Sequence, residues 1–143
     1  MPRTLKQSVE EALKAYSPLR TSRPDITVTV DDGVVILSGY VSSASIKGMA
    51  SILAGSVDGV NEVVNELLAD PDLERSVALA LAQDERTRSL PIRVRSETGH
   101  VQLQGQVPGE EAVETALAVA RTVDGPKQIF SAMRVNGLAP LAA

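Results

Sequence analysis

The chain has 143 residues and no run near the roughly 20 consecutive apolar residues that a membrane-spanning helix requires. It has no cysteine, no tryptophan, one histidine and 2% aromatic residues, which excludes disulfides and thiolate metal sites and leaves little catalytic or base-stacking material. A net charge of −4 is opposite in sign to a nucleic-acid-binding surface. We therefore expect no enzyme, no cofactor and no nucleic acid partner.

The first predicted element is a helix over residues 5–16. Apolar residues recur there at three- and four-residue spacing, and Thr4 with Gln7 has the pattern of a capping box. Charged side chains within this helix interrupt the continuous apolar run that a signal peptide needs. We therefore expect a cytoplasmic protein.

A hairpin, a second helix and a third strand follow. Apolar and polar residues alternate over residues 26–41 around an Asp-Gly pair, which is typical of two strands joined by a tight turn. Helical spacing over residues 46–57 predicts the second helix, ended by Asp58-Gly59. The last strand is predicted over residues 63–67.

The second half of the chain repeats the first. At one constant offset, residues 33–41 align with residues 99–107, with both glycines and the alternate apolar positions in register. We therefore expect an α+β fold of two tandem αββαβ domains, each a three-stranded sheet covered by two helices. The predicted domains are residues 1–69 and 70–136, and residues 137–143 are predicted to form a C-terminal tail.

The motifs of residues 32–41, 57–60 and 63–67, taken together at their spacing, resemble the BON domain (bacterial osmotically induced and nodulation domain). The second copy departs from this pattern, with Thr98 for the turn aspartate and Ser131 for the asparagine. The resemblance implies a non-enzymatic module. Members of the family are proposed to attach to phospholipid surfaces during osmotic stress, and some cytoplasmic members are associated with ion sensing.

Two isolated polar features could carry chemistry, and neither has the partners for it. His100 has no second histidine or cysteine to complete a metal site, so we expect a surface strand residue. Asp31 and Asp32 have no third or fourth oxygen ligand nearby, which favours a role in the turn over a cation site. We expect no catalytic and no metal-binding residue.

Asn65 lies between apolar neighbours on the last strand of the first half. It could bind a ligand, but satisfying backbone groups near the strand is the favoured interpretation. The acidic residues Glu110, Glu111 and Glu114 open a helix, where carboxylates complement the helix dipole, so we do not interpret them as an acid–base pair.

The two copies differ most on their helices, where charged or polar residues of the first copy are replaced by apolar ones in the second. A helix that is apolar on two sides must bury both, and domains of this size are marginal alone, so this extra face should dock against a partner. The predicted interaction surface consists of Ala78, Leu79, Ala82, Val113, Leu117 and Ala120.

Together these features predict a non-catalytic binding or assembly module, acting in a stress response, that associates with itself or with another protein. A phospholipid surface is the alternative partner, because Arg75, Arg86 and Arg88 flank the apolar face. A cytoplasmic ion-sensing module is a further alternative that the family resemblance implies.

Overall fold

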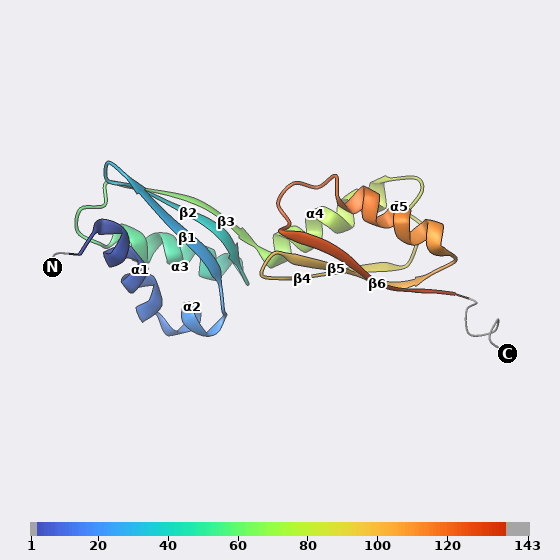
Figure 1. The fold of residues 1–143 in the computed structure, drawn as a ribbon, viewed down its shortest axis with the longest axis horizontal. Helices are drawn as coiled ribbons and strands as arrows, with labels where there is room; N and C mark the ends of the chain where they lie inside the picture. The colour runs from blue at the N-terminus through green and yellow to red at the C-terminus, as the bar shows by residue number, and fades with distance from the viewer. Residues whose placement is uncertain (1–2, 137–143) are drawn as a thin grey trace. The chain divides into compact units, whose positions relative to one another are not determined.

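A computed structural model describes residues 3–136 and divides the chain into two compact units, Met1–Pro71 and Asp72–Ala143 (Figure 1). Each unit holds one three-stranded sheet whose middle strand pairs antiparallel with the first strand and parallel with the third. The predicted α+β class and tandem arrangement are therefore confirmed. Among the described residues, every helix is too short or too polar to span a bilayer.

The two units share one order of elements, apart from one additional short helix in the first. The first unit contains α1 (Leu5–Ala15), α2 (Ser17–Thr21), β1 (Asp25–Asp31), β2 (Val34–Val41), α3 (Ala44–Gly55) and β3 (Glu62–Ala69). The second contains α4 (Asp70–Gln83), which starts at the boundary, β4 (Ile92–Glu97), β5 (His100–Val107), α5 (Glu110–Ala120) and β6 (Gln128–Val135).

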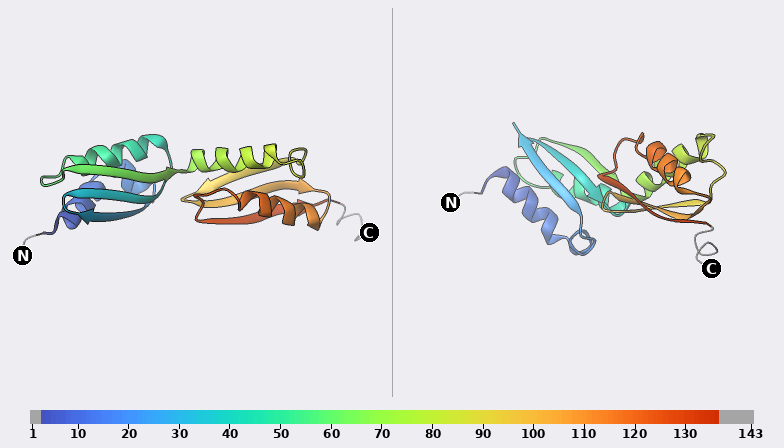
Figure 2. Two further views of the ribbon diagram at one scale, coloured as in Figure 1. Left: turned by 90° about the horizontal axis from the view of Figure 1, so that it is seen from above. Right: turned by 45° about the vertical axis from the view of Figure 1, so that its right-hand side comes forward.

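Each core lies between the helices and one face of the sheet, here called the inner face. In the first unit, α1, α2 and α3 cover inner-face residues such as Val35, Leu37 and Leu67, all fully buried. In the second unit, α4 and α5 lie on one side of their sheet, as Figures 1 and 2 show, over buried Val101 and Leu103. Side chains alternate along a strand, so each sheet has two faces. The helices of each unit lie on the inner face, and the other face carries no helix of its own unit.

The two hairpin turns have the same backbone geometry. Asp32 and Gly33 have φ of 50° and 80°, and Thr98 and Gly99 have φ of 50° and 84°. The carbonyl of each turn glycine accepts a hydrogen bond from the segment before the third strand, at 2.8 Å in both units. The duplication seen in the sequence is thus preserved in the hydrogen bonding of both units.

The short helix α2 was absent from the predicted order, which was wrong for the first unit. Pro18 lies in its first turn, where a missing N–H is not needed, and buried Leu19 attaches it to the core. The signal was present in Ser17-Pro18. A five-residue helix is too short to show an apolar period, so periodicity alone misses it.

The predicted ends of the second helices were also wrong. Helix α3 ends at Gly55 and α5 at Ala120, well before Asp58-Gly59 and its counterpart. The Ser56 and Thr122 hydroxyls donate to helix carbonyls at 2.7 and 2.6 Å, which satisfies groups the last turn leaves free. Gly59, with φ of 97°, turns the following loop instead. The predicted tail, residues 137–143, lies outside the described residues.

Candidate functional site

The predicted interaction surface is only partly exposed. Leu79 lies on the outer side of α4 with 55% of its surface exposed, and Ala78 and Ala82 are also exposed. Ala120 is fully buried in the core of the second unit, so its assignment to the surface was wrong. Ala120 lies one helical turn after Ala116, which is also buried, so both residues lie on the side of α5 that faces the sheet.

Val113 and Leu117 are half-buried. They lie on the side of α5 that faces away from α4. A small concavity is lined by Ala80 and Gln83 of α4, by Val119 of α5 and by Thr122 just after it, which marks the sides that the helices turn toward each other. By helical periodicity, residues 113 and 117 lie on the opposite side of α5. We therefore define the α4 surface as Ala78, Leu79 and Ala82 alone.

Asn65 has a structural role in the first unit. Its side-chain NH2 donates to the Lys47 carbonyl at 2.8 Å and to the Ser51 hydroxyl at 2.7 Å, both on α3, and its carbonyl accepts from the Leu67 N–H at 3.0 Å. Every polar group of the side chain is used within the fold. Asn65 therefore ties β3 to α3, as the favoured interpretation predicted.

The second unit replaces this tie. Ser131 occupies the corresponding strand position, and its hydroxyl accepts only the local bond, from the Met133 N–H at 3.0 Å. Leu117 occupies the position equivalent to Ser51. The second unit therefore has Leu117 and Ser131 where the first has the hydrogen-bonded pair Ser51 and Asn65. The apolar character of Leu117 thus matches a change inside the unit and does not indicate an outer contact.

We expect Asn65→Ser to lower the free energy of unfolding by about 1 to 3 kcal/mol, because two bonds to α3 are lost while the local bond to Leu67 is kept. Urea denaturation followed by circular dichroism measures this loss. Ser131→Ala is the control, since it removes one local bond and should cost no more than about 1.5 kcal/mol. An Asn65→Ser loss below that of the control would contradict the tie.

The other candidate polar residues lie apart from one another. His100 lies on β5 with its Nδ1 3.1 Å from Oε1 of Gln128, and Asp31 and Asp32 are exposed at the first hairpin turn. Glu110 and Glu111 lie in the first turn of α5. Within residues 3–136, no three histidine or acidic side chains come together in a way that could hold a metal ion.

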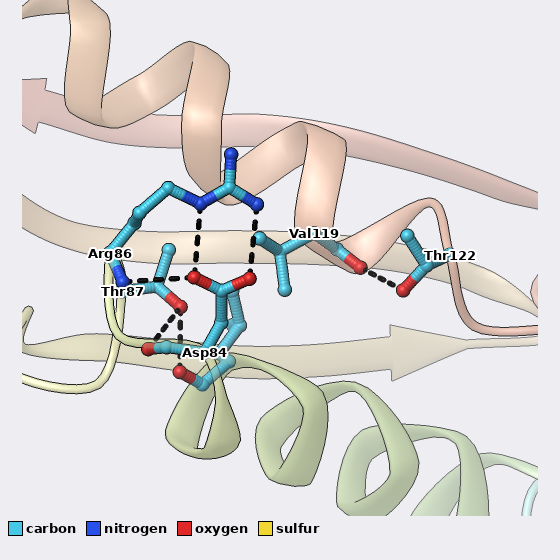
Figure 3. A network of polar contacts seen from close by, with 6 residues as sticks. Asp84, Arg86, Thr87, Val119 and Thr122 are labelled. Atoms are coloured by element: carbon cyan, nitrogen blue, oxygen red, sulfur yellow. Dashed lines mark hydrogen bonds and ion pairs between the residues drawn. The ribbon is translucent and has the colours of Figure 1, made fainter.

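A polar network that sequence reasoning missed closes the end of α4 (Figure 3). The Asp84 carboxylate accepts from Nε, from a terminal nitrogen and from the backbone N–H of Arg86, at 2.9 to 3.0 Å. The Thr87 hydroxyl, 1% exposed, donates to the Leu81 carbonyl at 2.6 Å. The side-chain bond from Arg86 lowers the pKa of Asp84, so this carboxylate stays ionised and acts as a loop brace.

The uncovered sheet faces of the two units differ in charge, which sequence reasoning also missed. We call these the outer faces. The strands β1, β2 and β3 contain no lysine or arginine, and Asp31, Glu62 and Glu66 lie on their outer face. The strands of the second unit place Arg93, Arg95 and Arg134 on theirs, with Glu97 as the acidic residue.

The outer face of the second unit is broad and polar. Strand register places Arg95, Gln102 and Phe130 in one row across the sheet and Arg93, Gln104 and Ala132 in the next. This face holds an open concavity of about 980 Å³. Phe130 is 38% exposed.

Comparison with known proteins identifies relatives over nearly the whole chain. A family model described as the BON domain matches twice, over residues 3–71 and 69–137. Outer membrane lipoprotein DolP of Haemophilus influenzae is 29% identical over 142 residues, covering 92% of this chain and 72% of that protein. Osmotically-inducible protein Y of Escherichia coli is 28% identical over 141 residues, covering 90% and 69%. The name of the first relative places that protein at the outer membrane.

A solved structure shares the fold. CdsD, a structural protein of the type III secretion system of Chlamydia trachomatis, aligns with a TM-score of 0.76 at 14% identity, over 95% of this chain. The chain spans 63% of that structure. At this identity the likeness shows the tandem arrangement of units and no more.

Proposed function

The chain belongs to the BON domain family, and from that premise we propose that it is a non-catalytic binding module whose α4 surface docks onto a second copy or another protein. The observation that carries the proposal is Leu79, a large aliphatic side chain exposed between Ala78 and Ala82. The name of osmotically-inducible protein Y supports a setting of osmotic stress.

The corresponding helix of the first unit is charged at the equivalent positions. There, Glu10, Glu11 and Lys14 occupy the positions of Ala78, Leu79 and Ala82, and Glu11 is paired with Arg3. Small side chains around one leucine let another chain approach closely. Burying the exposed 55% of Leu79 would contribute roughly 1 to 2 kcal/mol, enough to decide a weak association.

A second candidate function is attachment to phospholipid. Arg75 lies one turn before Leu79 on the same helix, and the lipoprotein name of the first relative points to a membrane setting. An exposed leucine beside a cation is suited to the boundary between lipid headgroups and acyl chains. The two candidates use the same surface and differ in what covers it.

We expect Leu79→Glu to weaken association at least about tenfold, because a charge replaces the side chain that is buried on docking. Analytical ultracentrifugation of the full chain measures this, and circular dichroism should stay unchanged, since the side chain is exposed. Ile52→Glu is the matched control, because Ile52 is exposed on α3 to a similar degree.

Vesicle co-sedimentation separates the two candidates. If Leu79→Glu releases the chain from anionic phosphatidylglycerol vesicles and leaves its sedimenting mass unchanged, the surface serves the membrane. If neither mass nor vesicle binding responds, or if Ile52→Glu has the same effect as Leu79→Glu, the α4 surface is not a docking site.

A further inference from the structure

We propose that copies of this chain associate head to tail, with the outer sheet face of the first unit against the outer sheet face of the second unit of another copy. These faces are distinct from the α4 surface, so the contact goes beyond the proposed function and stands or fails separately. It rests on charge complementarity between two faces that no helix of their own unit covers.

The outer face of the first unit is apolar in the middle and acidic at its edges. Strand register places Val34 between Asp31 and Glu62 in one row, and Ile36 beside Val64 in the next row. Glu66 follows Val64 on the same face of β3. A partner face should therefore supply cations at its edges and a side chain that can cover the apolar centre.

The outer face of the second unit has that composition. Arg93 and Arg95 lie on β4 and Arg134 lies on β6, the two edge strands of the sheet, with three glutamines along β5 between them. Phe130 lies on the same face, in the row of Arg95, and supplies an exposed aromatic ring.

The charges on both faces are available. Among the described residues, no ion pair is formed by Glu62, Glu66, Arg93, Arg95 or Arg134. The ion pairs Arg3–Glu11, Asp72–Arg75, Asp84–Arg86 and Glu85–Arg88 all lie on helices and loops, outside the strands. Two unpaired faces of opposite charge in one chain favour a second copy as the partner, because every copy supplies both halves of the contact.

The size of the faces sets the strength of the contact. Three strands about 4.8 Å apart, with seven or eight residues at about 3.3 Å each, give a face of roughly 350 Å². A standard interface buries about 800 Å² on each partner, so a single contact is weak. We therefore expect association that grows over about 5 to 500 micromolar and weakens as salt screens the charges.

Two charge-reversed full-length variants test the contact. Arg93→Glu with Arg95→Glu makes both faces acidic, and Asp31→Arg with Glu62→Arg and Glu66→Arg makes both faces basic. Each variant alone should associate at least about tenfold more weakly than the parent, measured by analytical ultracentrifugation at low salt. An equimolar mixture of the two should associate again, because each face then meets one of opposite charge.

A third variant, Lys6→Glu with Arg121→Glu, makes the same change in charge as the acidic variant, outside the strands, and should associate like the parent. Circular dichroism checks that all variants fold, which we expect because the changed side chains are exposed. A parent chain that stays monomeric at every concentration would overturn the proposal, as would a mixture that fails to recover. Association lost in Leu79→Glu but kept in both reversed variants would leave the α4 surface as the assembly site and reject the sheet faces.

Discussion

Replacing Gly39 or Gly105 with alanine is expected to remove about half or more of the stability of the unit that carries the change. A Cβ at Gly39 would lie 1.8 Å from the Asp25 carbonyl oxygen, and one at Gly105 would lie 2.2 Å from the Pro91 carbonyl oxygen. Both neighbours are backbone atoms, Asp25 in β1 and Pro91 directly before β4, and they cannot move without disturbing the hairpin. The φ angles, 120° and 137°, also disfavour any L side chain.

Backbone strain of this kind costs about 1 to 3 kcal/mol, and forcing the strands apart adds about as much. A unit of this size has roughly 4 to 10 kcal/mol in total, so the variant unit should lose about half of its stability or more and unfold at a much lower urea concentration. Urea titration followed by circular dichroism measures the effect. Gly48→Ala is the control, because nothing lies within 4 Å of its Cβ position and it sits in α3, where alanine should stabilise. Equal behaviour of Gly48→Ala and Gly105→Ala would show that the close approach does not matter.

Truncating one central leucine should destabilise one unit and spare the other. Leu37 and Leu103 are fully buried at equivalent positions of β2 and β5, and Leu→Ala at such sites costs about 2.7 to 5 kcal/mol, part of it for the cavity left behind. Because the core around Leu37 is built only from residues of the first unit, Leu37→Ala should lower the unfolding midpoint of that unit.

Amide hydrogen exchange resolves the two units in one experiment. Leu37→Ala should raise exchange in β1, β2 and β3 and leave β4, β5 and β6 near the parent value, and Leu103→Ala should do the reverse. Leu79→Ala, at an exposed position, should change neither. A uniform rise along the whole chain in either core variant would mean that the two units unfold as one.

Local sequence patterns were enough to predict the fold class and the repeat. Alternating apolar residues and the Asp32-Gly33 turn specify a hairpin locally, since strand period and turn chemistry depend on neighbours along the chain. The capping box of Thr4 and Gln7 formed as predicted, for the same reason. Local rules failed for α2, which is held by one buried leucine and has too few residues for a period.

Which side chains are exposed depends on tertiary packing and could not be predicted from the sequence. Apolar residues of the second copy that look equivalent in the sequence differ in burial. Leu79 is exposed, Leu117 is half-buried at the position equivalent to Ser51, and Ala120 lies in the core. Helical spacing gives the direction of a side chain only relative to its own helix. The positions of the sheet and the neighbouring helix determine whether that side chain is buried or exposed.

The charge difference between the outer sheet faces also required the tertiary structure. Along the chain, acidic and basic residues are spread over both halves, and the charges on helices and loops hide those on strands. Strand pairing brings Glu62 to the same outer-face row as Asp31, and it places Arg93 and Arg95 on one edge of the other sheet. Composition and spacing cannot supply this grouping, because it depends on contacts between residues far apart in the sequence.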